Sequence, residues 1–80
     1  MRIEIRLLTQ LKPYLPNPDI AGDTQIIDLK NDATVKDVMM ELGIPLDMPK
    51  VILLNEKQGK LEDHLKDGDR IIVFPPVGGG

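Results

Sequence analysis

The chain has 80 residues, a formal net charge of −3, and neither cysteine nor serine. This length predicts one domain, and the missing residues exclude disulfides, thiolate metal sites, cysteine nucleophiles and serine nucleophiles. Binding to nucleic acid is not expected without a basic run or a set of stacking aromatics, and no apolar run approaches membrane-spanning length.

Two further features of the composition bear on the core and on location. Tyr14 and Phe74 are the only aromatic residues, so the core must be built from aliphatic side chains. Met1 leads directly into an alternating pattern rather than into the apolar segment of a signal peptide. We therefore expect a cytoplasmic protein.

The first quarter of the chain predicts a strand and then a short helical segment. Apolar residues alternate with charged ones over residues 1–7, which is typical of a strand with one solvated face. Ile3, Ile5 and Leu7 are the inward set. Leucines at helical spacing over 8–15 predict a helical turn or two, because the prolines there prevent anything longer. After a loop over 17–23, residues 25–29 predict a second strand with Ile27 and Leu29 inward.

The most regular pattern in the sequence predicts a helix that starts after Thr34. The Thr34 hydroxyl is suited to cap the first turn, and Asp37, three residues on, completes a capping box. Apolar residues recur at helical spacing on one face, at Val35, Val38, Met39 and Leu42, with Met40 expected at the edge of the core. Gly43 is suited to the left-handed position that ends a helix.

The second half of the chain predicts strands over 51–54 and 70–74. Between them we expect a turn over 55–59, a brief strand at Lys60–Leu61, a helical turn flanked by Leu61 and Leu65, and a tight turn over 67–69. One helix must then cover one face of the sheet, with the first and last strands central and parallel. The prediction is an α+β, ubiquitin-like β-grasp domain over residues 1–74, with a mixed sheet of four to five strands packed on one main helix.

Residues 75–80 predict a flexible tail after the last strand. Pro75 and Pro76 cannot donate to a ladder, so the strand must stop or leave the sheet there. Val77 and three glycines follow, and at roughly 3.3 Å per residue the tail reaches about 20 Å. Glycine lacks a Cβ, so the end of the tail can pass through a narrow channel. The chemically distinctive group at its tip is the carboxylate of Gly80.

The sequence from Phe74 through Pro75, Pro76, Val77, Gly78 and Gly79 to Gly80 resembles the C-terminal signature of ubiquitin-like sulfur-carrier proteins. The resemblance is closest to the small subunit of molybdopterin synthase, whose tail typically reads Phe-Pro-Pro-Val-Ala-Gly-Gly, and the thiamin-pathway sulfur carrier is also similar. Gly78 stands where that family often has alanine.

The resemblance implies a carrier that is not itself an enzyme. A ubiquitin-activating-type adenylyltransferase, using ATP and Mg²⁺, would couple AMP to the Gly80 carboxylate. Sulfur from a donor protein would then replace AMP to give a thiocarboxylate, which the large catalytic subunit of the synthase consumes. Residues 75–79 would insert into the active site of each partner. The chain itself would bind no cofactor.

Three functions remain open on the sequence. The first is sulfur transfer for molybdenum or tungsten pterin cofactor synthesis, which the two prolines, Val77 and the chain length favour. The second is sulfur transfer for thiamin or thiolated tRNA. The third is protein modification through isopeptide bonds to lysines.

The alternation of side chains between the two faces of the strands predicted over 51–54 and 70–74 indicates a docking surface. If Ile71, Val73, Ile52 and Leu54 point inward, period two leaves Leu53, Ile72 and Phe74 exposed beside the tail. We expect this apolar surface to contact the adenylyltransferase and the synthase.

Two charged features have weaker interpretations. His64 is the only histidine, and without further ligands we expect a solvated turn residue rather than a metal site. The nearby acidic residues Glu62, Asp63, Asp67 and Asp69 could steer a basic partner or simply form solvated turns.

Overall fold

A computed structural model describes residues 1–76 of the chain. Along these residues the elements are β1 (Arg2–Leu7), the 3-10 helix η1 (Thr9–Tyr14), β2 (Thr24–Asp28), α1 (Val35–Leu42), β3 (Val51–Leu54), β4 (Lys57–Gln58) and β5 (Arg70–Phe74). The predicted tail begins here with Pro75 and Pro76, whereas Val77 to Gly80, and with them most of the segment predicted to be flexible, lie outside the described residues.

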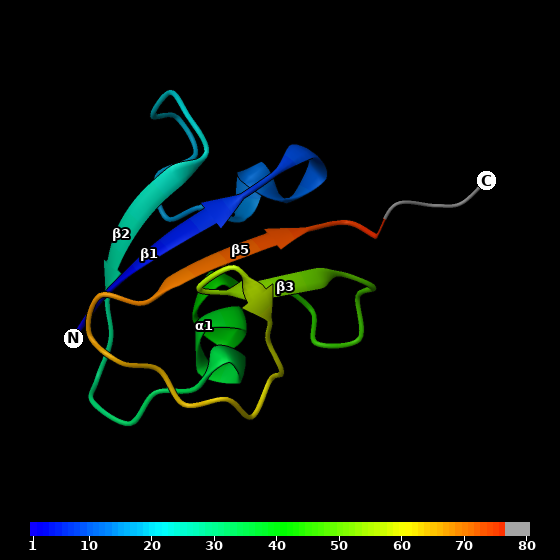
Figure 1. The fold of residues 1–80 in the computed structure, drawn as a ribbon. Helices are drawn as coiled ribbons and strands as arrows, with labels where there is room; N and C mark the ends of the chain where they lie inside the picture. The colour runs from blue at the N-terminus through cyan, green and yellow to red at the C-terminus, as the bar shows by residue number, and fades with distance from the viewer. Residues whose placement is uncertain (77–80) are drawn as a thin grey trace.

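The strands of residues 1–76 form a mixed sheet of five strands in the order β2-β1-β5-β3-β4, and α1 lies against one face of it (Figure 1). β1 and β5 pair in parallel with Ile5 opposite Ile71, and the antiparallel strands β2 and β3 flank them. This is the predicted ubiquitin-like β-grasp fold, with the first and last strands inside the sheet as expected.

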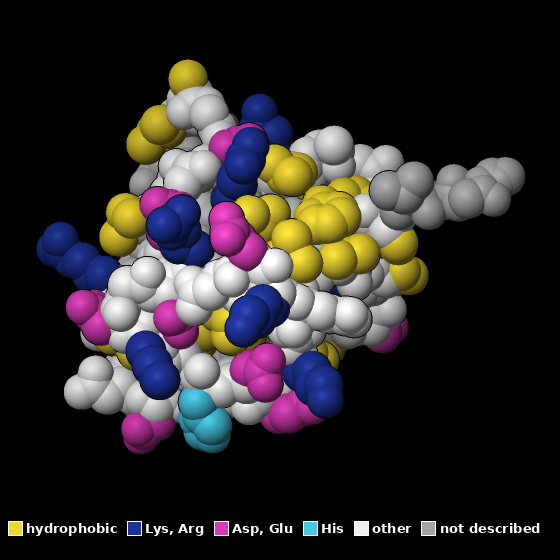
Figure 2. Space-filling view, viewed as in Figure 1, with side chains coloured by type: hydrophobic (Ala, Val, Ile, Leu, Met, Phe, Trp, Pro, Cys, Tyr) yellow, Lys and Arg dark blue, Asp and Glu magenta, His cyan; other side chains and the backbone are white. Residues whose placement is uncertain are grey.

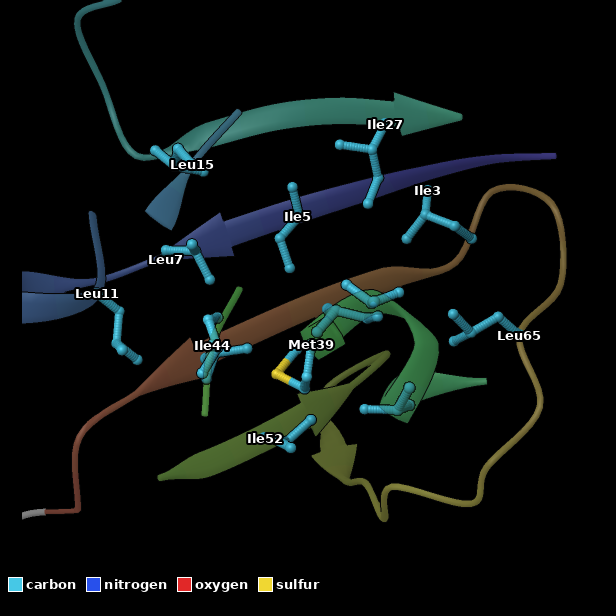
Figure 3. Close-up of a cluster of buried hydrophobic side chains, with 14 residues drawn as sticks. Ile3, Ile5, Leu7, Leu11, Leu15, Ile27, Met39, Ile44, Ile52 and Leu65 are labelled. Atoms are coloured by element: carbon cyan, nitrogen blue, oxygen red, sulfur yellow. The ribbon is translucent and has the colours of Figure 1, made fainter. Parts of the chain in front are cut away.

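The core lies between the sheet and α1 and is aliphatic, as the composition required. Ile3, Ile5 and Leu7 from β1 and Ile71 and Val73 from β5 have no exposed surface. Figure 3 shows side chains from both layers around Met39 of α1, among them Ile44 and Ile52. Leu29, Leu42 and Leu54 are partly buried and pack against this cluster. Period two in the strands and the apolar face of the helix therefore correctly predicted the core.

The helix is capped at both ends as predicted. The Thr34 hydroxyl accepts from the Asp37 amide at 3.3 Å, and the Asp37 carboxylate accepts from the Thr34 amide at 2.9 Å. Gly43 has φ +77°, and its amide donates to the carbonyls of the last turn. Met40 differs from the prediction. It is 60% exposed rather than at the edge of the core, and it borders a surface hollow with Asp28 and Leu29.

Two predicted elements between β3 and β5 are wrong. The short strand is Lys57–Gln58 rather than Lys60–Leu61. Asn55 and Glu56 both have positive φ, +51° and +71°, which makes a tight two-residue turn. Pairing therefore resumes at once, with Lys57 opposite Leu54.

The predicted helical turn between Leu61 and Leu65 is absent from the described structure. This segment instead runs alongside the start of α1, where Val35 donates to the Asp63 carbonyl at 3.0 Å and Lys36 donates to the Leu61 carbonyl at 2.8 Å. The first amides of a helix have no partner within the helix. The segment supplies those partners, and it closes an isolated bridge between Thr34 and His64.

Candidate docking surface and tail

The face of the sheet away from α1 has an apolar surface where β5 ends. Phe74 lies opposite Val51, and Ile72 lies opposite Leu53. We call these four residues the tail-proximal patch. Burial alternates along β5, with Ile71 and Val73 fully buried and Ile72 and Phe74 facing the other way. Figure 2 shows hydrophobic side chains gathered over this end of the sheet.

The predicted register of this patch is correct, but the predicted degree of exposure is wrong. Leu53, Ile72 and Phe74 are each half-buried rather than exposed. Directly opposed side chains on antiparallel strands lie close enough to cover one another, so Phe74 and Val51 shield each other, as do Ile72 and Leu53. The sequence argument missed Val51. The same alternation contains the signal, because Val51 lies two residues before Leu53.

A polar hollow adjoins the patch on the same face. It has a volume of about 320 Å³ and is lined by Ile72 of the patch and by Glu4, Arg6, Thr24, Asn55, Glu56 and Arg70. The Nε of Arg6 lies 3.3 Å from a carboxylate oxygen of Asp23. A hydrogen bond from the Thr24 hydroxyl, and then the Arg6 guanidinium, lower the pKa of Asp23 below its ordinary value. Charged groups of both signs therefore border the apolar patch, an arrangement typical of protein interfaces.

Backbone and side-chain hydrogen bonds hold β5 at both ends. At its start, the backbone amide of Arg70 donates to the Asn55 side-chain oxygen at 3.0 Å. The side-chain Nδ2 of Asn55 donates to the Asp69 carboxylate at 2.8 Å. Near its end, the Leu8 amide donates to the Val73 carbonyl at 3.1 Å. The point at which Pro75 leaves the sheet is therefore fixed.

The first tail residues border a second hollow. Pro75 is half-buried and Pro76 is exposed. Both line a hollow of about 350 Å³, together with Gln10, Leu11, Tyr14, Met48 and Pro49. Of the predicted tail, Val77, Gly78, Gly79 and Gly80 lie outside the described residues, so the structure places only the start of the tail beside the patch.

The acidic residues near His64 have structural roles. Asp63 accepts from the Lys60 amide, Asp67 accepts from the Arg2 amide, and Asp69 accepts from the Lys66 amide. Of the two interpretations of this cluster, the structure supports turn-forming residues. His64 is exposed, and nowhere in residues 1–76 do three histidine, aspartate or glutamate side chains come together as a metal ion requires. No helix in the described part of the chain is long and apolar enough to cross a membrane.

This fold, a mixed five-strand sheet covered on one face by a single helix, is that of small ubiquitin-like proteins. The chain belongs to the ThiS family, whose model matches residues 16–80. No match was found among proteins with curated descriptions.

Solved structures share the whole fold. SAMP1 from Haloferax volcanii is 24% identical with a TM-score of 0.77, and the alignment covers 100% of both chains. The small archaeal modifier protein 1 (SAMP1) from Methanosarcina acetivorans is 22% identical with a TM-score of 0.69, covering 99% of this chain and 96% of that one.

A third similar structure is a chain from a complex. It belongs to the protein–protein complex of subunits 1 and 2 of the molybdopterin-converting factor from Helicobacter pylori 26695. It is 26% identical with a TM-score of 0.64, and the alignment covers 100% of both chains. The similar structures thus include SAMP1 proteins and a chain from a molybdopterin-converting factor complex.

Proposed function

We propose that this protein is a sulfur carrier for molybdopterin synthesis and that Gly80 carries the reacting carboxylate. The observation that carries the proposal is the tail sequence from Phe74 to Gly80, which follows a strand held at both ends and begins beside an apolar patch. Membership of the ThiS family supports the carrier role. Carriers of this type are generally non-catalytic, so the chemistry belongs to the partners.

In the proposed reaction the Gly80 carboxylate is the reacting group. A terminal carboxyl group ordinarily has a pKa of about 3.3–3.7 and is ionised at neutral pH. Its oxygen attacks the α-phosphorus of ATP, held with Mg²⁺ by an adenylyltransferase, and pyrophosphate leaves. Hydrogen sulfide released by the sulfur donor then attacks the acyl carbon, the bond from that carbon to the AMP phosphate oxygen breaks, and AMP leaves. The product is a thiocarboxylate with a soft sulfur nucleophile.

The carrier contributes reach and position to this chemistry. A positioned reactant replaces a bimolecular encounter by an effectively unimolecular step. We propose that Pro75 and Pro76 direct the tail away from the sheet, and that Val77, Gly78 and Gly79 enter the partner's channel. The absence of a Cβ lets the glycine backbone approach the channel wall closely.

We propose that the tail-proximal patch docks two partners in turn, the adenylyltransferase and the large subunit of the synthase. The H. pylori complex supports the second of these, because a chain of similar fold is there assembled with another subunit. The proposed location of all three proteins is the cytoplasm.

Protein modification is the second candidate function. The likeness to two structures named as small archaeal modifier proteins favours it. A modifier would use the same activated Gly80 to form an isopeptide bond with a lysine. Sulfur transfer for thiamin or thiolated tRNA also remains open, since it uses the same tail. Recovery of this chain attached to lysines in cell extracts would favour the modifier.

The test of the carrier proposal is intact mass measurement after incubation with the cognate adenylyltransferase, ATP, Mg²⁺ and a sulfur donor. We expect the protein to gain the mass of one oxygen-to-sulfur exchange, localised to Gly80. Adding one alanine after Gly80 moves the carboxylate by about 3.3–3.6 Å. Because reaction needs atoms within about 3–3.5 Å, that variant should not be activated.

Two further variants separate reach from chemistry. Deletion of Gly80 shortens the reach, and amidation of Gly80 keeps the reach but removes the ionised carboxylate. Neither should be activated, and both should unfold at the same urea concentration as the unmodified protein. Activation of all three altered proteins, or failure of the unmodified one, would refute the sulfur-carrier proposal.

A further inference from the structure

The edge of the sheet formed by β2 borders a long groove beside α1. Two adjoining hollows make up this groove, with volumes of about 520 and 530 Å³, and Asp28 and Glu41 line both. Ile26 and Met40, which are 59% and 60% exposed, line one hollow each. The first hollow also has Tyr14, Leu15 and Leu42 on its walls. Apolar side chains, the carboxylates of Asp28, Asp37 and Glu41, and one lysine, Lys30, define the chemistry of the groove, in which acidic groups outnumber basic ones.

β2 presents backbone hydrogen-bonding groups along this edge. In the described chain β2 is the outermost strand, with β1 on its only paired side (Figure 1). Met1 and Leu29 exchange two backbone hydrogen bonds of 2.7 and 2.8 Å, and Leu7 donates to the Asp23 carbonyl at 2.9 Å. Hydrogen-bonded pairs recur at every second residue of an antiparallel ladder. The odd-numbered residues of β2 therefore bond to β1, and the backbone groups of Thr24, Ile26 and Asp28 point to the free edge.

The two edges of the sheet are protected to different degrees. β4 at one edge is only two residues long and carries Lys57, and short, lysine-bearing edges discourage strand addition. β2 is five residues long, has neither lysine nor proline, and exposes Ile26. An edge of this kind is open to pairing with another strand.

We propose that the β2 edge binds an extended peptide segment of a partner protein as an additional strand. The backbone of the peptide bonds to Ile26 and Asp28. Peptide side chains alternate between the two faces of the sheet, so one set enters the groove beside Leu42 and the other packs on Ile26. Basic residues of the peptide face Asp28 and Glu41. The Oδ1 of Asp28 lies 3.3 Å from Arg2 Nε, but both side chains are more than three-quarters exposed, so this ion pair is weak and easily exchanged.

This site lies apart from the tail. β1 separates β2 from β5, so a peptide at the β2 edge leaves the tail-proximal patch free. The inference therefore goes beyond the proposed sulfur transfer. It describes a second surface through which the carrier is recruited to proteins that contain a short apolar and basic strand.

The test is an amide chemical-shift titration with a capped synthetic peptide of sequence Lys-Lys-Val-Ile-Val-Thr-Val-Lys. We expect the shifts to centre on Ile26 and Asp28 and to extend to Glu41 and Leu42. Hydrogen exchange of the Ile26 and Asp28 amides should slow by about tenfold or more at saturation, because strand addition protects edge amides. Two further peptides carry methyl groups on alternate sets of backbone nitrogens. Only one set faces β2, so methylation of that set should weaken binding by about tenfold, and methylation of the other set should leave binding unchanged.

A matched pair of variants locates the site. Ile26→Lys should weaken binding by about tenfold or more through charge repulsion and loss of the apolar contact. Ile20→Lys should not, because Ile20 is 57% exposed in the loop before β2 and lines neither hollow. A version of the peptide with glutamate in place of each lysine should also bind about tenfold more weakly.

Several results in the peptide experiments would overturn the proposal. They include a failure of the peptide to bind and chemical-shift changes centred on Ile72 and Phe74. They also include equal loss of binding in Ile26→Lys and Ile20→Lys, and equal binding of the two methylated peptides. Concentration-dependent shifts of residues 24–28 without peptide would also overturn it, since the occupant would then be a second copy of the chain. Both lysine variants should give the unperturbed amide spectrum of a folded protein.

Discussion

At the scale of single residues, Asp37 links the start of α1 to pH. The hydrogen bond from the Thr34 backbone, and then that from the Thr34 hydroxyl, lower the pKa of Asp37 from its ordinary value of 3.8. A carboxyl group whose pKa is lower in the folded state stabilises the fold above its unfolded pKa. That stabilisation is lost as the pH falls through the lower, folded pKa.

We therefore predict that Asp37→Ala lowers the urea midpoint of unfolding at pH 7. The difference from the unmodified protein should shrink as the pH falls below 3.8 toward the folded pKa, because protonation then removes the same hydrogen bonds. Asp19→Ala, in the exposed loop before β2, is the control and should change the midpoint little. A difference that is the same at pH 7 and in acid would contradict the role assigned to Asp37.

At the scale of one element, the two faces of β5 differ in burial. Ile71 and Val73 face the core and are fully buried, whereas Ile72 and Phe74 face away and are half-buried. Removing a fully buried side chain costs its transfer free energy and leaves a cavity. Truncating a half-buried residue costs less, since neighbouring water reaches the vacated space. Stability and partner binding should therefore separate along alternate residues of one strand.

We predict that Phe74→Ala weakens binding to the adenylyltransferase by about 2 kcal/mol, or roughly 30-fold, as for an interface aromatic anchor. Its free energy of unfolding should fall by less than that of Ile71→Ala, for which the expected loss is about 2–5 kcal/mol. Urea unfolding and titration calorimetry measure the two effects. Unchanged binding of Phe74→Ala to both the adenylyltransferase and the synthase subunit would remove the patch from the proposed interface.

At the scale of the whole molecule, the sheet is most stable at its centre and least stable at its edges. β1 and β5 supply five fully buried side chains, and each has a strand on both sides. β4 has two residues, both exposed. Opening of a structure requires least free energy where few apolar contacts are lost.

We predict that hydrogen exchange follows this order. Amides in the β1–β5 ladder should exchange only through global unfolding, and those of β4 should exchange fastest among the strands. In β2, the edge-facing amides of Ile26 and Asp28 should exchange much faster than those of Gln25 and Ile27, which bond to β1. Equal protection of alternate β2 amides would contradict the open edge, and exchange should be followed by two-dimensional NMR in deuterated buffer.

Much of the fold was predictable because period and capping are local properties of the sequence. Alternation placed Ile3, Ile71 and Val73 in the core, and the Thr34 and Asp37 pair marked the start of α1. The rule that neither a sheet nor a helix buries its apolar face alone then led to the β-grasp arrangement. For the candidate site, the same alternation predicted which way Leu53, Ile72 and Phe74 point.

One of the remaining features depends on local backbone angles, and the others depend on contacts between residues far apart in the chain. Positive φ at Asn55 and Glu56 shifted the short strand to Lys57, and neither residue type signals such a turn as clearly as glycine. Residues 61–65 form a turn and a bridge instead of a helical turn, because the carbonyls of Leu61 and Asp63 accept from the first amides of α1, a demand set by another element. The half-burial of Phe74 depends on its partner Val51, and the open edge of β2 depends on which strand lies beside it.

Sequence alone thus determined which residues are buried together and which way each strand faces, because these follow from side-chain chemistry and backbone period. Only the tertiary structure decided how far each outward residue is covered and which edge remains unpaired, because both depend on neighbours brought together by folding.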